Sequence, residues 1–211
     1  STVLCGERVL TTAPYTAYVR IADGCDNRCA YCAIPLIRGP HVSVPMEQVL
    51  DEARRLAAGG VRELMVIAQD TTYYGVDLYG RRRLADLLTE LCRIGGIEWI
   101  RLHYAYPTGF PDDVIEVMAH EPKICKYLDI PFQHISDAQL KAMKRRHTKA
   151  DAYRLVRLCP TSLCVRRCSW AIRARRRPIS RSCCNSSTTC VSTGWASSPI
   201  PRRRVPIRRC I

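Results

Sequence analysis

The chain has no acidic residue after Asp151 and no lysine after Lys149, although its formal net charge is +14 over 211 residues. Residues 159–211 hold 12 of the 33 basic residues, all arginine, and seven of the 13 cysteines. The first 158 residues contain the other 21 basic residues and all 19 acidic ones, a charge balance that is ordinary for a globular domain. The positive charge therefore belongs to the tail, and it does not indicate a nucleic-acid-binding domain.

Long apolar runs and a leader segment are also missing from the sequence. No stretch of 18 apolar residues is present, so we expect no membrane-spanning helix. The chain does not begin with a basic segment followed by an apolar one, so we expect no signal peptide. A cytoplasmic protein without a membrane partner fits both absences, and its thiols would stay reduced. The cysteines are then expected to be free thiols or metal ligands.

The arginine-rich tail shows no sustained period of 2 or 3.6 residues, so it predicts neither strand nor helix. In a shifted reading frame, the codons for the segment from Trp170 are compatible with "GYPGETEADFAELLQFV", which has acidic residues and helical spacing. A disordered RNA-binding tail would explain the arginines but not this second text. We therefore predict a change of reading frame between Leu158 and Leu163. The expected organisation is a linker remnant at 1–15, a core at 16–158 and an out-of-frame, non-native or disordered tail at 159–211.

Short apolar runs alternate with amphipathic segments through the core. This βαβα order with short connections predicts an α/β fold with a parallel sheet. Polar residues follow the apolar runs in "AQD", "HYAYP" and "IPFQH", which favours chemistry at the carboxyl edge of a barrel-like sheet. The predicted strands are 17–21, 63–70, 99–104 and 126–134, and the predicted helices are 45–60, 83–96, 111–121, 136–146 (with Ser136 as N-cap) and 149–158.

Three cysteines follow the first predicted strand in "GCDNRCAYC", residues 24–32: Cys25, Cys29 and Cys32. A structural zinc site needs a fourth ligand, such as His41, Cys5 or a cysteine from elsewhere, and its ligands usually come as two close pairs. One triplet with no second pair suits an iron–sulfur cluster in which one iron has no protein ligand. Both metals remain open on spacing alone.

The segment "CDNRCAYC" resembles the CxxxCxxC loop of radical S-adenosylmethionine (SAM) enzymes, including the aromatic Tyr31 and the position after strand one. The segments "YVRIADGCDNRCAYCAIPLIRG", "IAQDTTYYGVDLYG" (67–80) and "KICKYLDIPFQHIS" (123–136) are similar to the methylthiotransferase branch, in particular to members that modify protein S-twelve of the small ribosomal subunit. The resemblance covers roughly residues 10 to 158. It implies a partial (βα) barrel of radical SAM type, truncated after about four strands.

The resemblance also implies the cofactors. In that family three cysteines bind three irons of a [4Fe–4S] cluster, which assigns Cys25, Cys29 and Cys32 as metal ligands. The amino and carboxylate groups of S-adenosylmethionine bind the fourth iron. An external electron donor is implied, and so is a second [4Fe–4S] cluster in an N-terminal domain that this chain lacks.

Further residues receive roles by the same resemblance. Tyr31 is expected to contact the adenine region of the cofactor, with a hydrophobic plug as the alternative. Gln69 and Asp70 are expected at the polar end of the cofactor, with a simple strand cap as the alternative. His134 is a candidate to line the site, or a structural histidine at a strand end. No catalytic residue is assigned.

The implied reaction is methylthiolation of an aspartate in a small-subunit ribosomal protein. An electron cleaves S-adenosylmethionine, the 5′-deoxyadenosyl radical removes a hydrogen from the aspartate β-carbon, and sulfur and a methyl group are added. The alternatives are a transfer-RNA methylthiotransferase and, from another class, a non-catalytic zinc module with a basic RNA-binding tail. Because a sulfur-donating domain and later barrel strands are missing, we expect this chain alone not to methylthiolate.

Overall fold

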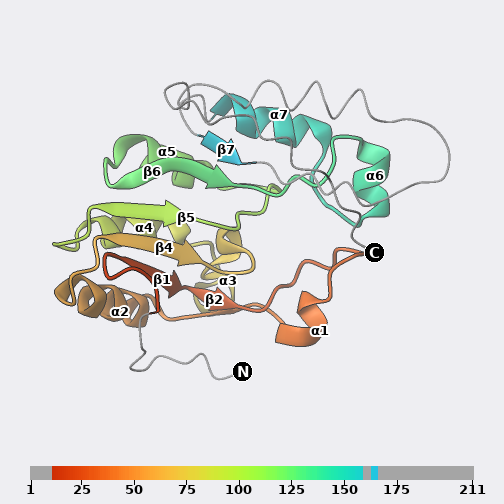
Figure 1. Ribbon diagram of the computed structural model, residues 1–211. Helices are drawn as coiled ribbons and strands as arrows, with labels where there is room; N and C mark the ends of the chain where they lie inside the picture. Colours follow the sequence, from red (N-terminus) through yellow and green to blue (C-terminus); the bar gives the residue numbers. More distant parts are fainter. Residues whose placement is uncertain (1–10, 159–162, 166–211) are drawn as a thin grey trace, which may run out of the picture.

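The computed structural model describes residues 11–158 and 163–165, in which five parallel strands form one sheet in the order β1-β4-β5-β6-β7 (Figure 1). A short antiparallel pair, β2 with β3, lies beyond the end of β1. The α/β class with a parallel sheet is therefore confirmed. The strands are β1 Thr16–Arg20, β2 Ala22–Asp23, β3 Val42–Ser43, β4 Glu63–Ile67, β5 Trp99–Leu102, β6 Ile124–Asp129 and β7 Leu163–Val165.

Helices connect the successive strands of the sheet, as the alternating pattern predicts. None of those in the described residues has the length and hydropathy needed to cross a membrane. Each of the four apolar runs that were predicted as strands forms a strand of the sheet and is followed by a helix. The helical elements are α1 Ile34–Arg38, α2 Met46–Ala58, η1 Thr71–Tyr73, α3 Val76–Tyr79, α4 Leu84–Cys92, α5 Asp112–His120, α6 Asp137–Ala142 and α7 Lys149–Leu158.

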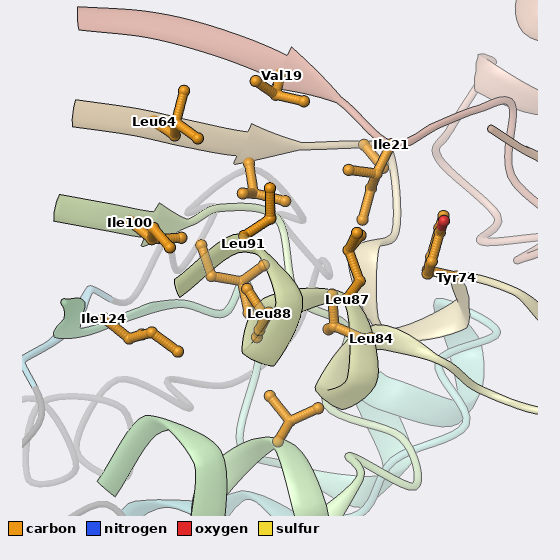
Figure 2. Close-up of a cluster of buried hydrophobic side chains, with 14 of the residues drawn as sticks. Val19, Ile21, Leu64, Tyr74, Leu84, Leu87, Leu88, Leu91, Ile100 and Ile124 are labelled. Atoms are coloured by element: carbon orange, nitrogen blue, oxygen red, sulfur yellow. The ribbon is translucent and has the colours of Figure 1, made fainter. Parts of the chain in front are cut away.

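The main core lies between one face of the sheet and the helices α2, α4 and α5 (Figure 1). Strand residues such as Leu64 and Ile100 are fully buried on this face, and the leucines of α4 point toward them (Figure 2). Burying one such side chain contributes roughly 1.5–3 kcal/mol. The four leucines recur at helical spacing, which gives α4 one continuous apolar stripe: Leu84, Leu87, Leu88 and Leu91.

The opposite face of the sheet is more polar and less buried. Tyr18 and Trp99 are exposed there, since successive strand side chains alternate between faces. Arg101 forms an ion pair with Glu63, with 2.8 Å between Nη2 and Oε1, and its guanidinium lies over the Tyr127 ring. Glu63 and Trp99 are the first residues of β4 and β5, so they lie toward the amino ends of the strands.

A fifth strand, β7, extends the sheet beyond the four strands predicted from the sequence. Strand β7 pairs in parallel with β6, and Leu163 lies opposite Tyr127 in the register. An unpaired edge offers backbone N–H and C=O groups, and the short apolar segment of β7 satisfies three positions of that edge. The segment 163–165 is therefore a strand, although it lies in the tail predicted to be non-native. The rest of that tail, and residues 1–10 of the predicted linker, lie outside the described residues.

Local predictions also differ from the structure, and β6 ends at Asp129 although a strand was predicted as far as residue 134. The strand predicted at 63–70 ends at Ile67, because the side chain of Asp70 accepts a 3.1 Å hydrogen bond from the Thr72 N–H and begins η1. Ser136 is the N-cap residue of α6, as predicted, but its side chain makes no capping bond. Its N–H instead donates to Nδ1 of His134 at 2.9 Å.

Candidate functional site

The cysteine loop, residues 24–33, extends from the end of β2 to the start of α1, beyond the carboxyl ends of the sheet strands (Figure 1). Cys25, Cys29 and Cys32 are free, half-buried thiols on this loop. The Cys32 N–H donates to the Cys29 carbonyl at 3.1 Å, and the Cys25 N–H donates to the Gly39 carbonyl at 3.2 Å. The loop is thus held by its own backbone at the edge where the sequence predicts chemistry.

A glycine begins the loop because no other residue fits there. Gly24 has φ +73°, a left-handed conformation that side chains disfavour. A Cβ at this position would lie 1.9 Å from the carbonyl oxygen of Pro40. The close approach of the two chain segments brings Cys25 beside Gly39, whose carbonyl accepts its N–H.

A hydrogen bond ties the middle of the loop to the end of β4. Asn27 Nδ2 donates to Asp70 Oδ2 at 2.7 Å. The buried Asp70 also accepts from the N–H and the hydroxyl of Thr72 through Oδ1, at 3.1 and 2.6 Å. Asp70 therefore caps η1 and anchors the cysteine loop.

The segment after α6 supports the loop from the other side. Ala30 N–H donates to the Met143 carbonyl at 3.0 Å. Arg145 Nη1 donates to Cys29 Sγ at 3.6 Å, and the hydroxyl of Tyr106 lies 3.9 Å from the same sulfur. The structure thus brings a buried arginine and a buried tyrosine to one of the three thiols.

The other residues predicted for the site lie as follows. Tyr31 is 47% exposed, and burial of the remainder raises the pKa of its phenol while Arg145 opposes the shift. Gln69 is half-buried and its Oε1 has no hydrogen-bond partner in the described residues. His134 accepts the hydrogen bond from Ser136, which is a structural role at the start of α6. The exposed ring of Tyr31 leaves a face available to a ligand.

Several residues near the site were not predicted. Asn27 lies within the recognised loop, and its amide is an obvious partner for a carboxylate. Tyr106 belongs to the quoted "HYAYP", where the polar end of a strand was noted without an assignment. Arg145 has no local signal, because a pair of basic residues after a helix normally lies in solvent. His103 was also missed, and its Nδ1 lies 3.7 Å from Oδ2 of Asp129 on the next strand.

A small polar cavity of about 190 Å³ adjoins the loop. The buried His41 lies at its wall, and burial lowers the pKa of this imidazole. Nδ1 of His41 has no hydrogen-bond partner in the described residues, whereas Nε2 lies 3.1 Å from the Ser43 hydroxyl. The lining residues are Asp26, Asn27, His41, Asp70, Tyr73 and Arg146.

The three thiols fit a cluster better than a single ion. Nowhere in residues 11–158 do three Cys, His, Asp or Glu side chains converge as one ion would require. In an iron–sulfur cluster each thiolate binds a different iron, so the sulfurs need not converge. Burial raises the pKa of the Cys25 thiol, with Asn27 acting in the opposite sense, so metal binding must displace its proton. Three thiolates on one loop are the donor set that such a cluster uses.

Comparison with known proteins gives consistent matches. The family model described as the radical SAM superfamily matches residues 19–162. The ribosomal protein uS12 methylthiotransferase RimO of Flavobacterium johnsoniae is 60% identical over 154 residues, which are 73% of this chain and 35% of that protein. The RimO of Bacteroides fragilis is 53% identical over 150 residues, 71% of this chain and 35% of that protein. The chain thus spans about a third of the length of these curated relatives.

Solved structures share the fold at low sequence identity. The radical S-adenosylmethionine methyltransferase TsrM from Kitasatospora setae, with cobalamin and a [4Fe–4S] cluster bound, has a TM-score of 0.59 and 21% identity. It covers 72% of this chain, and the match spans 30% of TsrM. The cobalamin-dependent S-adenosylmethionine radical enzyme OxsB has a TM-score of 0.54 and 16% identity, over 72% of this chain and 23% of OxsB. At these identities the likeness concerns the fold alone.

Proposed function

This chain belongs to the radical SAM superfamily, and from that membership we propose that it is the central part of a methylthiotransferase acting on ribosomal protein uS12. The observation that carries the proposal is the loop with Cys25, Cys29 and Cys32 at the carboxyl edge of the sheet, in a stretch 60% identical to a protein of that name. Relatives of the same name at 53–60% identity favour a ribosomal protein over transfer RNA as the substrate.

We assign the three thiolates as ligands of a [4Fe–4S] cluster that leaves one iron for S-adenosylmethionine. When bound, these two cofactors supply the one-electron and methyl-transfer chemistry of the superfamily. The residues of the protein bind and orient these two cofactors. Gln69 Oε1, half-buried and without a partner in the described residues, is suited to accept a hydrogen bond from the cofactor's amino group. Tyr31 offers its exposed ring to the adenine.

The remaining assignments concern partners and location. A second [4Fe–4S] cluster, the sulfur donor, is proposed in a further domain of the whole enzyme, together with an external electron donor. A cytoplasmic location is proposed because free thiols at a cluster loop require a reducing compartment. The substrate is the aspartate-bearing surface of uS12. The chain as given is expected to cleave S-adenosylmethionine weakly and not to complete methylthiolation.

The predicted change of reading frame receives support from the comparisons. The family match ends at residue 162, within the interval between Leu158 and Leu163 where the shift is proposed. Sequencing the gene around these codons should give a continuous frame that encodes "VGYPGET" after one base is added or removed. A single frame with no such continuation would leave the arginine-rich tail as the true sequence.

Metal analysis of the reconstituted chain tests the assignment of the thiols. Anaerobic reconstitution with iron and sulfide should give about four irons per chain and broad thiolate-to-iron absorption. Replacing any one of Cys25, Cys29 or Cys32 with alanine should abolish a stable cluster, while Cys92→Ala, in helix α4, should retain it. Binding of zinc without sulfide, or a full complement of iron in Cys29→Ala, would contradict the proposal.

A further inference from the structure

Arg145 is a buried cation in direct contact with one cysteine of the loop. The side chain is only 8% exposed, and Nη1 donates to Cys29 Sγ at 3.6 Å. Nη2 donates to the carbonyl of Pro131, just beyond the end of β6. Nε is buried without a hydrogen-bond partner in the described residues. A buried guanidinium normally has its donors satisfied, so a free Nε beside a thiol suggests that another acceptor binds there.

Tyr106 fixes the position of this guanidinium. The centre of the guanidinium lies 4.2 Å from the centroid of the Tyr106 ring, a cation–π distance. The Tyr106 hydroxyl lies 3.9 Å from Cys29 Sγ and becomes a donor when the sulfur is a thiolate. Two donors held by one stacked pair therefore point at the same sulfur.

Resting on the proposed function, we propose that Arg145, with Tyr106, is a positioning residue that raises the reduction potential of the cluster bound by Cys29. Hydrogen bonds to the ligand sulfurs and local charge are the means by which proteins set such potentials. Among the hydrogen bonds of the described residues, Arg145 reaches the sulfur of Cys29 and not those of Cys25 and Cys32. The positive charge thus acts through one ligand of the three.

The direction of the effect follows from the charge balance. One-electron reduction of a [4Fe–4S] cluster adds one negative charge and no proton, and the electron comes from an external reductant. A fixed positive charge and two donors at a ligand sulfur stabilise the more negative, reduced form more than the oxidised one. The pair therefore favours reduction, which is the step that must precede cleavage of S-adenosylmethionine.

Variants of the two residues separate charge, hydrogen bonding and ring contact. Arg145→Gln removes the charge, Arg145→Lys keeps the charge but loses the planar fork, and Tyr106→Phe removes one donor while keeping the ring. Lys141→Gln is the matched control, because it removes one positive charge from the exposed surface of the neighbouring helix α6. In each variant the backbone bond between Ala30 and Met143 remains available to hold the loop.

The measurement is a redox titration of the reconstituted full chain, followed by the electron paramagnetic resonance signal of the reduced cluster, with iron counted in parallel. Arg145→Gln should shift the reduction equilibrium toward the oxidised form by about tenfold, which is ~59 mV for one electron. Arg145→Lys should lie closer to the unchanged protein, Tyr106→Phe should shift less in the same direction, and Lys141→Gln should not shift.

The outcomes are decisive in each case. A lowered potential in Arg145→Gln with unchanged iron supports the inference, because a residue that merely held the loop would not move the potential. An unchanged potential overturns it. Loss of the cluster in both Arg145→Gln and Arg145→Lys also overturns it and makes Arg145 a loop anchor. If the unchanged protein itself bound no cluster, the proposed function would fail together with this inference.

Discussion

Asn27 and Asp70 are 43 residues apart in the chain, and a 2.7 Å hydrogen bond joins the amide of the first to the carboxylate of the second. This bond connects the cysteine loop to the strand exit that carries Gln69. The position of the cysteine loop and the position of Gln69 therefore both depend on this hydrogen bond. A substitution at Asn27 or at Asp70 should alter the position of both.

Asp70→Ala should destabilise the protein by about 1–3 kcal/mol. The variant loses the cap of η1, worth about 0.5–2 kcal/mol, and leaves the Asn27 amide without its acceptor. Urea unfolding followed by circular dichroism measures the change. Asp51→Ala is the control, because its ion pair with Arg54 is exposed and should contribute less than about 1 kcal/mol. Equal losses in the two variants would contradict the anchoring role of Asp70.

Gly24→Ala should disrupt the cysteine loop more than Gly39→Ala. Both glycines have positive φ, +73° and +76°, so both variants carry a backbone cost of about 1–3 kcal/mol. Gly39 has open space where a Cβ would lie, whereas Gly24 faces the Pro40 carbonyl at 1.9 Å. The clash should add about 1–3 kcal/mol. Unfolding midpoints and iron content together test this, and identical behaviour of the two variants would show that the close approach is not needed.

His147 should make stability fall as the pH is lowered from about 6.5 to about 4. Burial, followed by the charge of Arg145, lowers the pKa of this imidazole to about 4 from its ordinary 6.5. Between these values the unfolded chain binds a proton that the folded protein does not, so the free energy of unfolding rises with pH. The full effect is up to about 3 kcal/mol and is complete above pH 6.5.

Urea titrations at pH 4.5, 5.5 and 7 should reveal the contribution of His147. His147→Phe removes the ionisable group, so part of the pH dependence should disappear, and the remainder should include His41, whose pKa burial also lowers. A slope that is the same in His147→Phe and in the unchanged protein would contradict the pKa assignment.

Gln69→Leu should weaken binding of S-adenosylmethionine to the reconstituted protein by roughly tenfold to a hundredfold. A hydrogen bond to a charged group contributes about 1.5–3 kcal/mol, and the leucine cannot accept one. Gln69→Glu keeps an acceptor at the same place and should bind at least as tightly as the unchanged protein. Isothermal titration calorimetry under anaerobic conditions measures both. Undiminished affinity in Gln69→Leu would remove Gln69 from the cofactor site.

The α/β order was predictable because each strand and helix of the core carries its own apolar period. Helix α4 illustrates this, since its four buried leucines recur at spacings of three and four. The end of β4 was less predictable. The residues from 63 to 70 predict one strand. In the structure the side chain of Asp70 accepts a hydrogen bond from the Thr72 N–H, and a helical turn begins there. Local side-chain bonds of this kind compete with strand pairing and leave no periodic signal.

The thiols of the site were predictable from spacing, whereas their surroundings were not. Cys25, Cys29 and Cys32 are neighbours in sequence, so their pattern is visible in the chain. Arg145 reaches Cys29 from 116 residues away, and only the packing of the segment after α6 against the loop brings them together. Strand β7 was missed for a related reason. Its pairing depends on the open edge of β6 rather than on any period in the arginine-rich tail.

The two-residue ladder between β2 and β3 joins the start of the cysteine segment to its end, with Ala22 opposite Ser43 and Asp23 opposite Val42. Ser43 is held in turn by Asp77, which accepts from its N–H at 2.8 Å and from its hydroxyl at 2.6 Å. The 18 residues between the two strands therefore begin and end at one fixed pair of short strands. Because the β2–β3 pair closes its base, we expect a change of length within the segment to leave the register of the parallel sheet unaltered, while it would disturb the contacts of the loop with Asp70, Met143 and Arg145.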